Sequence, residues 1–174
     1  MIAVASRPAR SECRPVPPTF MAPFRRGLKA MAGMIDISGK SDVLRRAVAT
    51  GEVLLQRHTI ESIRTGRVDK GDVFESAKVA ALHAAKRASE ALPYCHPIPI
   101  AATNVRLEAR DDRVVATVEV KATYKTGVEM EALYACAVAL LTVWDMVKKG
   151  EKDESGQYPF VRIQGLRVLE KEKG

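Results

Sequence analysis

The sequence predicts an α+β fold in which helices cover one face of an antiparallel sheet. Two kinds of pattern support this: stretches with alternating apolar residues, as in strands, and stretches with apolar residues at helical spacing. They follow one another in the order strand, helix, strand, strand, helix, strand. The third observation is length, because 174 residues suffice for one domain with a sizeable core but hardly for two.

The first strand is predicted between Val43 and Leu55, where small and apolar residues occupy alternate positions. Gly51 interrupts this stretch. The pattern therefore fits an extended strand or a hairpin, with Gly51 as the bend or bulge. Residues 59–65 then fit a short helix that Gly66 ends.

A longer helix is predicted to begin after Asp72. Asp72 fits an N-cap, Glu75 fits its return partner three positions later, and the helix stops before Pro93. Two strand-like runs follow, over residues 98–110 and 113–124. The two aspartates between these runs indicate a hairpin.

A second capping box, over residues 126–129, predicts a helix that reaches about Lys149. A charged loop over residues 151–156 and a final strand over residues 157–169 follow. This order of elements is the ferredoxin-like pattern. We therefore expect a ferredoxin-like sandwich, with the helices packed on one face of the sheet.

The second long helix predicts association between copies of the chain. It is apolar around most of its circumference over residues 132–144, so it needs cover on more than one side. A single sheet covers one side only, and we expect an oligomer that uses this helix as an interface. The same uncharged run has 13 residues, too few to span a membrane, so no membrane partner is expected.

The positive charge of the chain is concentrated near its N-terminus. Of the formal net charge of +7, residues 1–33 contribute +5, from six basic residues and one acid. They also hold five of the nine prolines. We predict a flexible basic extension over residues 1–33 and one domain over residues 34–174. The alternatives for residues 1–33 are an organelle transit peptide, or a translation start at Met31 or Met34. Since the domain is nearly neutral, no nucleic-acid partner is expected.

Cysteine usage fits a reducing compartment. Cys13, Cys95 and Cys136 are an odd number without C-x-x-C spacing, which argues against a disulfide framework or a structural zinc site. We therefore predict a cytoplasmic protein without a resident metal or cofactor.

Two loop residues are candidates for binding phosphate. Lys70 lies two positions before a predicted helix N-cap, and helix N-termini attract phosphate, although an ordinary surface lysine is the alternative. His96 lies in a proline-fenced segment, residues 93–99, that fixes the imidazole. No second ligand pair at metal spacing is present, so contact of His96 with a phosphate or base is favoured over a metal site.

The apolar helix carries candidate residues at both ends. Near its C-terminus an aspartate, Asp145, is electrostatically unfavourable, although a surface ion pair with Lys148 would account for it. Near its N-terminus the capping box explains Glu129 but not Glu131. Glu131 and Asp145 are 14 residues apart, or roughly 21 Å along a helix. If both are functional, they must contact one small substrate from two different chains.

Seven motifs, in order, resemble one family closely: residues 34–40, 45–51, 70–73 (Lys-Gly-Asp-Val), 85–87, 95–97 (Cys-His-Pro), 126–133 (Thr-Gly-Val-Glu-Met-Glu-Ala-Leu) and 145–146 (Asp-Met). The family is that of the cyclic pyranopterin monophosphate synthases, the molybdenum-cofactor biosynthesis proteins C. The resemblance covers about residues 34–169. It implies a ferredoxin-like fold in a homohexamer, a trimer of dimers with active sites at the dimer interfaces. It also implies that 3′,8-cyclo-7,8-dihydro-GTP rearranges to cyclic pyranopterin monophosphate with release of pyrophosphate.

The resemblance also implies roles for individual residues. Asp145 would be catalytic, with Lys70 and Lys148 as acid/base and phosphate-handling partners. The residues expected at the substrate site are Tyr94, Cys95, His96, Glu129, Met130 and Glu131, with Arg45 and Lys125 as further cations for the triphosphate. A divalent ion such as Mg²⁺ could accompany the triphosphate.

The chain departs from the family at three places. Tyr94 stands where a leucine is usual, Ala88 stands where a threonine is common, and the C-terminus lacks the Gly-Lys-Ser-Gly type tail often found there.

Two other functions compete with this interpretation. The first is a nucleotide- or RNA-binding ferredoxin-like module that uses the basic extension. Such a module needs aromatic side chains on its sheet for base stacking, and only 5% of the residues are aromatic. The second is an inactive homologue retained as an assembly partner, against which the intact Lys70, Asp145 and Lys148 argue.

Overall fold

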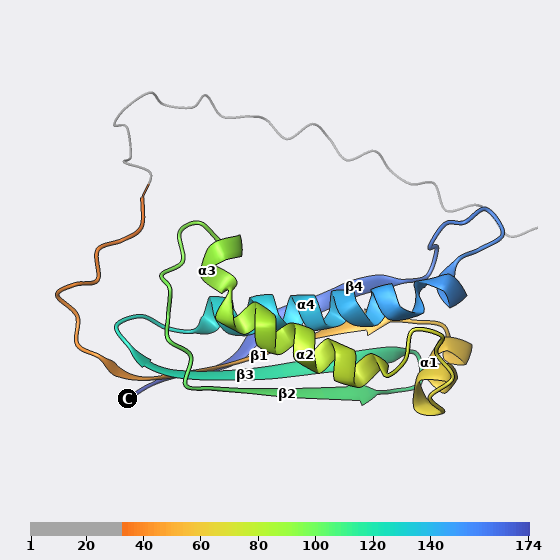
Figure 1. The fold of residues 1–174 in the computed structure, drawn as a ribbon, viewed down its shortest axis with the longest axis horizontal. Helices are drawn as coiled ribbons and strands as arrows, with labels where there is room; N and C mark the ends of the chain where they lie inside the picture. Colours follow the sequence, from red (N-terminus) through yellow and green to blue (C-terminus); the bar gives the residue numbers. More distant parts are fainter. Residues whose placement is uncertain (1–32) are drawn as a thin grey trace, which may run out of the picture. The chain divides into compact units, whose positions relative to one another are not determined.

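The computed structural model describes residues 33–174, shown in Figure 1. The extension predicted over residues 1–33 therefore lies outside the described residues, except for Gly33. The elements are β1 (Val43–Leu54), α1 (Arg57–Arg64), α2 (Val73–Lys86), α3 (Ala88–Ala91), β2 (Ala102–Ala109), β3 (Arg113–Tyr124), α4 (Glu129–Val147), the 3₁₀ turn η1 (Lys148–Glu151) and β4 (Arg162–Lys173).

The four strands form one antiparallel sheet in the order β2-β3-β1-β4. The two central strands pair without interruption, from Val43 opposite Tyr124 to Leu54 opposite Arg113. Helices α2 and α4 lie side by side over one face of this sheet (Figure 1). The predicted α+β class is confirmed.

The core lies between the sheet and the two long helices. On β3 every second residue from Val114 to Ala122 is buried, as alternation in a strand requires. The helices contribute mostly small side chains, which allow close approach between their backbones. The buried alanines of α2 and α4 are Ala77, Ala81, Ala84, Ala85, Ala132, Ala135 and Ala139.

The first strand is continuous, so the hairpin alternative for residues 43–55 is wrong. The register between β1 and β4 does shift at this point, but the extra residue lies on β4 and not at Gly51: Thr50 pairs with Arg167 and Glu52 with Gln164, so Gly51 alone faces two residues of β4. A Cβ at Gly51 would lie 2.9 Å from Leu140 Cδ1 and 3.3 Å from Leu166 Cδ1. Glycine is needed there because α4 and β4 both pack closely on that point.

The N-cap predicted for α2 is confirmed. The Glu75 amide donates to Asp72 Oδ1 at 2.9 Å, which satisfies one of the free amides in the first turn of the helix. The short helix α1 begins at Arg57, two residues before the predicted start. The strand predicted from residue 98 begins only at Ala102, because prolines at 97 and 99 cannot donate to a ladder.

The second predicted capping box is wrong. Helix α4 begins at Glu129, after Val128, and no side chain caps it. The first helical hydrogen bond runs from the Ala132 amide to the Val128 carbonyl. The Glu129 carboxylate instead folds over Gly127 and pairs with Lys171 of β4. Because the Glu129 carboxylate forms this tertiary ion pair, it does not take part in the local capping box.

Helix α4 ends at Val147 and tightens into the 3₁₀ turn η1, so it stops before the predicted Lys149. The last strand also differs from the prediction, since β4 begins at Arg162 and continues to Lys173. Its final residues pair with the beginning of β1, where Arg45 lies opposite Lys173. This partner strand gives the charged C-terminal residues a strand conformation that their polarity alone does not predict.

Counted with η1, the long helix Glu129–Glu151 has the length and mean hydropathy of a membrane-spanning helix, which the uncharged run alone did not indicate. It packs on the sheet and on α2, and a helix in the core of a folded domain can have the same length and mean hydropathy. Part of its apolar surface stays exposed: Met130 and Leu141 on α4, with Leu166 and Leu169 on β4 beside it.

Candidate functional site

The predicted site residues form two groups at opposite ends of α4. Lys70, Asp145 and Lys148 gather at its C-terminal end, whereas Cys95, His96 and Glu131 gather at its N-terminal end. The helix is unbroken between Glu131 and Asp145, so roughly 21 Å separates these residues. Within one chain, the two groups cannot contact the same small molecule.

At the C-terminal end of α4, one carboxylate lies between two ammonium groups. Asp145 Oδ2 accepts a hydrogen bond from Lys70 Nζ at 2.7 Å, and Oδ1 accepts one from Lys148 Nζ at 2.7 Å. Lys70 Nζ also donates to the Asp145 carbonyl at 2.8 Å. Asp145 is thus part of a three-residue cluster, which offsets its unfavourable place near a helix C-terminus.

Local structure explains how Lys70 reaches Asp145. The chain turns between Val68 and Gly71, whose amide donates to the Val68 carbonyl at 3.0 Å. Gly71 has a φ of 97°, a left-handed conformation that side chains disfavour. Lys70 occupies this turn just before α2 begins, and its side chain extends to the last turn of α4.

The lysines control the protonation of this group. Lys148, followed by Lys70, holds the pKa of Asp145 at about 2, below its ordinary 3.8, and Asp145 in turn raises the pKa of Lys148. The three side chains are 45–56% exposed, so water screens the pairs. At neutral pH the cluster is therefore a solvated carboxylate and two ammonium groups, with one net positive charge.

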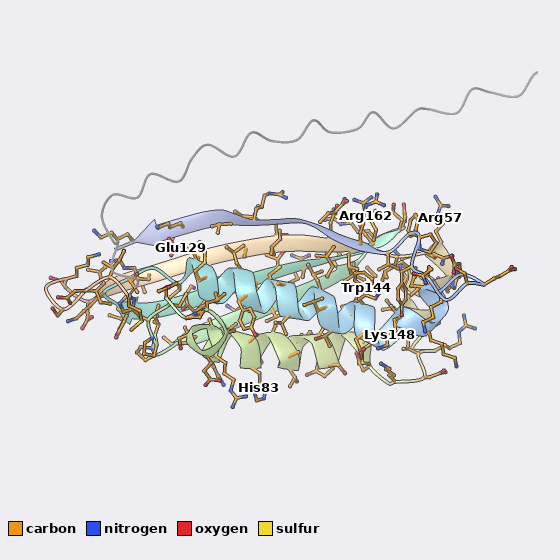
Figure 2. The ribbon with its side chains drawn as sticks, turned by 90° about the horizontal axis from the view of Figure 1, so that it is seen from above. Arg57, His83, Glu129, Trp144, Lys148 and Arg162 are labelled. Atoms are coloured by element: carbon orange, nitrogen blue, oxygen red, sulfur yellow. The ribbon has the colours of Figure 1, made fainter. Side chains whose placement is uncertain are left out.

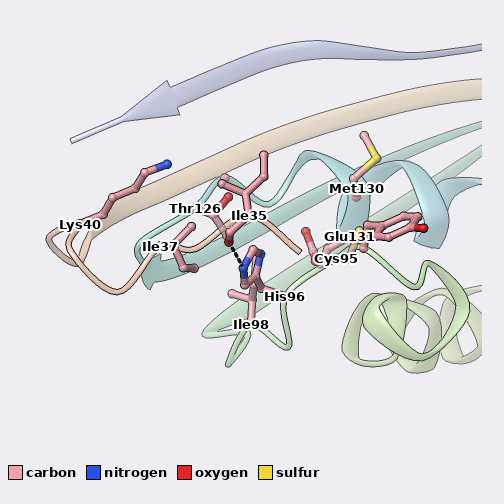
Figure 3. A pocket seen from close by; sticks show the side chains of 11 residues that line it. Ile35, Ile37, Lys40, Cys95, His96, Ile98, Thr126, Met130 and Glu131 are labelled. Atoms are coloured by element: carbon pink, nitrogen blue, oxygen red, sulfur yellow. Dashed lines mark hydrogen bonds between the residues drawn. The ribbon is translucent and has the colours of Figure 1, made fainter. Parts of the chain in front are cut away.

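At the N-terminal end of α4, side chains line a cavity of about 240 Å³, shown in Figure 3. The segment before β1 forms one wall, and residues around His96 together with the first turn of α4 form the rest. The His96 ring donates from Nε2 to the Ile35 carbonyl at 2.8 Å. This bond fixes the imidazole orientation, as the flanking prolines predicted.

Glu131 is the buried carboxyl group of this cavity. It is 3% exposed, and its Oε2 has no hydrogen-bond partner among residues 33–174. Burial raises the pKa of Glu131, and the negative charge of Glu129 raises it further. Burial, together with Glu131, also raises the pKa of the Cys95 thiol. This end of α4 therefore offers a desolvated polar group that lacks a partner.

The remaining predicted residues differ in their contacts. Tyr94 and Met130 line the cavity and are exposed. Arg45 donates to the Tyr124 and Lys125 carbonyls at 3.3 and 3.4 Å, and Lys125 donates to the Ser38 carbonyl at 3.0 Å. Arg45 thus fastens the start of β1 to the end of β3, and Lys125 fastens the segment before β1 to the same place.

Six residues of this cavity were not among the predicted site residues. They are Ile35, Ile37, Lys40, Ile98, Thr126 and Gly127. All except Ile98 lie within the motifs at residues 34–40 and 126–133, and those motifs were the available signal.

A divalent ion finds no ready-made site here. Among residues 33–174, no three His, Cys, Asp or Glu side chains lie close enough to hold a metal. The Asp145 carboxylate already accepts bonds from two lysines.

Comparison with known proteins identifies the family of this chain. Residues 34–174 match the model of the MoaC family. A probable cyclic pyranopterin monophosphate synthase of Methanosarcina acetivorans is 57% identical over 143 residues, which are 82% of this chain and 90% of that protein. Proteins described in the same words from Thermococcus onnurineus and Sulfolobus acidocaldarius are 51% and 54% identical over 80% of this chain, covering 90% and 98% of their own lengths. With the family model and these relatives covering most of its length, the chain belongs to the MoaC family.

Proposed function

We propose that this protein is a cyclic pyranopterin monophosphate synthase, a lyase of an early step in molybdenum cofactor biosynthesis. It converts 3′,8-cyclo-7,8-dihydro-GTP to cyclic pyranopterin monophosphate and releases pyrophosphate. The curated relatives carry the name of this activity. The observation that carries the proposal is the cluster in which Asp145 lies between the ammonium groups of Lys70 and Lys148.

This cluster suits the phosphate half of the reaction. A sugar hydroxyl attacks the phosphorus nearest the ribose and loses its proton to solvent, a P–O bond forms, and the bond to the leaving pyrophosphate breaks. Lys70 and Lys148 stabilise the charge that develops on the phosphate oxygens. With its pKa near 2, Asp145 is a poor proton acceptor at neutral pH, so it orients the two lysines.

The cavity at the other end of α4 suits the base-derived half of the substrate. Glu131 can donate a hydrogen bond when protonated, because burial favours its neutral form. His96, Cys95, Tyr94 and Met130 lie around it. These groups are of the kind that hold a planar, hydrogen-bonding ring. Arg45 and Lys125 add positive charge near this end.

One active site therefore needs both ends of α4, and they come from different chains. The proposed assembly is a homohexamer, a trimer of dimers in which each site joins the Lys70–Asp145–Lys148 cluster of one chain to the Glu131 cavity of another. The exposed apolar side chains of α4 and β4, Met130, Leu141, Leu166 and Leu169, support this.

The proposed fold is a ferredoxin-like sandwich, supported by the strand order β2-β3-β1-β4 and the helices on one face. The proposed location is the cytoplasm, which the cysteine usage supports, with residues 34–174 as the active domain. Magnesium, if required, enters with the triphosphate.

The test is pyrophosphate release from purified protein given 3′,8-cyclo-7,8-dihydro-GTP. We expect release from wild type together with cyclic pyranopterin monophosphate. Asp145→Ala should lower turnover by about 10²–10⁴-fold, because the Asp145 carboxylate no longer holds the ammonium groups of Lys70 and Lys148 in place. Asp111→Ala, an exposed turn residue, is the matched control and should behave as wild type. Absence of release by folded wild type would refute the activity, and full activity of Asp145→Ala would refute the site.

A further inference from the structure

The end of the long helix carries a buried carboxylate that the proposed chemistry does not use. Glu151 is the last residue of the turn η1 and is 0% exposed. The same turn begins with Lys148, three residues earlier. Figure 2 shows Lys148 at the same end of the molecule as Arg57, the first residue of α1. Glu151 therefore belongs to the same turn as Lys148 of the proposed phosphate-binding cluster.

Glu151 connects the turn η1 to the beginning of α1. Its Oε1 accepts a hydrogen bond from the Gln56 amide at 2.9 Å. Gln56 occupies the N-cap position of α1, and its own side chain makes no capping bond. Next to this contact, the His58 ring donates from Nε2 to the Gly150 carbonyl at 3.0 Å. We call these two contacts the clasp.

The clasp joins the two segments that supply the cluster. Helix α1 leads directly into the loop that carries Asp69 and Lys70, whereas α4 and η1 carry Asp145, Lys148 and Lys149. Other links between these segments are the ion pairs Lys70–Asp145 and Lys149–Asp69. These ion pairs are exposed, so water and salt weaken them. The Glu151 side chain is buried and its bond to the Gln56 amide is partly buried, so water and salt screen this bond less than the exposed ion pairs.

Stability alone does not account for Glu151. Its second oxygen, Oε2, is buried without a partner among the described residues, and a carboxylate left in that state opposes folding. An apolar side chain would fill the same space without that cost. What it could not supply is an acceptor for the Gln56 amide.

We propose that Glu151 is a positioning residue for the Lys70–Asp145–Lys148 cluster. By holding η1 against the beginning of α1, it fixes the place of Lys148 relative to Lys70. Misplacing a group that acts in the transition state by about 1 Å can lower turnover by about 10²-fold. This inference rests on the proposed function of the cluster.

Two substitutions separate positioning from charge. Glu151→Ala removes the acceptor for the Gln56 amide, and we expect kcat to fall by about 10–10²-fold, with KM changed less than about threefold, because several other cations hold the triphosphate. Glu151→Gln keeps an oxygen at the Oε1 position and should keep kcat within about threefold of wild type. Kinetics are measured at a temperature at which circular dichroism shows every variant folded.

A stability control distinguishes positioning from general loosening. Val118→Ala removes buried side-chain volume from the middle of β3 and lowers the melting temperature without touching either segment of the clasp. It should keep wild-type kcat. The inference is overturned if Glu151→Ala matches Val118→Ala in kcat, or if Glu151→Gln is as impaired as Glu151→Ala.

Asp145→Ala, measured in the same series, tells the two hypotheses apart. If Asp145→Ala retains full activity, the cluster itself is not the site and the proposed function of these residues fails. If Asp145→Ala is inactive while Glu151→Ala turns over as the Val118→Ala control does, only the positioning role of Glu151 fails.

Discussion

The two ends of α4 hold their carboxyl groups in opposite ways. Asp145 is half-exposed, and two lysines keep its pKa near 2. Glu131 is buried, and desolvation raises its pKa. The carboxyl group at the C-terminal end of α4 is therefore charged at neutral pH, whereas burial favours the neutral form of the carboxyl group at the N-terminal end. A substrate with a charged triphosphate and a planar heterocycle needs both environments, and a single rigid helix keeps them apart within one chain.

The difference would suit contact with a second chain. A charged cluster can stay exposed because water stabilises its ions, whereas Oε2 of the buried Glu131 has no partner among residues 33–174. A second chain packed against α4 would cover the exposed apolar side chains. It would also place the charged C-terminal end of one α4 helix beside the N-terminal end of another, where Glu131 is buried. The following predictions test that arrangement, from the largest effect to the smallest.

Lys70→Ala should have the largest effect. It removes one of the two cations on Asp145, and we expect turnover to fall by about 10²–10⁴-fold. Lys78→Ala is the matched control, because within the described part of the chain this exposed lysine pairs only with Glu75, on the surface of α2. Steady-state pyrophosphate release measures both variants. Retention of half the wild-type turnover by Lys70→Ala would contradict the role of the charged end.

Mixing inactive variants should restore part of the activity. Lys70→Ala damages the charged end and Glu131→Ala the buried end, so a mixed dimer contains one site with both ends intact. After the subunits are dissociated together and reassembled, random pairing should restore about a quarter of wild-type turnover. Mixing Lys70→Ala with Asp145→Ala, which damage the same end, should restore none. Equal results from the two mixtures would exclude a site shared between chains.

The smallest predicted effect concerns stability and pH. Because the pKa of Glu131 is higher in the folded chain than its unfolded value of 4.5, its contribution to stability is complete below pH 4.5 and is lost as pH rises through the folded pKa. Glu131→Gln stays neutral throughout. Its unfolding free energy, compared with that of wild type, should therefore improve between pH 4 and pH 8. Denaturant unfolding at fixed protein concentration measures this.

Glu154→Gln, in the exposed loop after η1, serves as the control for that experiment, and its stability should follow wild type across the same pH range. If the unfolding free energies of wild type and Glu131→Gln changed with pH in parallel, the pKa of Glu131 would be the same in the folded and the unfolded chain. That result would contradict the prediction.

Short-range patterns predicted much of the fold. The Asp72 cap, the extended run of β1 and the long apolar helix were recognised because caps and hydrophobic periods involve residues a few positions apart. The capping box before α4 was misread for the opposite reason. Glu129 pairs with Lys171, a residue of the last strand, and no local pattern contains that partner.

For the candidate site, too, local patterns were predictable and long-range contacts were not. The sequence by itself determined that Glu131 and Asp145 lie at opposite ends of one helix, because helical rise fixes their separation. Only the tertiary structure decided that Lys70 meets Asp145 across 75 positions and that Glu151 bonds the Gln56 amide across 95. It also decided that the Glu131 carboxyl is buried, with its Oε2 unpartnered among the described residues. The physical reason is that burial and long-range contacts depend on how elements pack, whereas periodicity and capping depend only on neighbours along the chain.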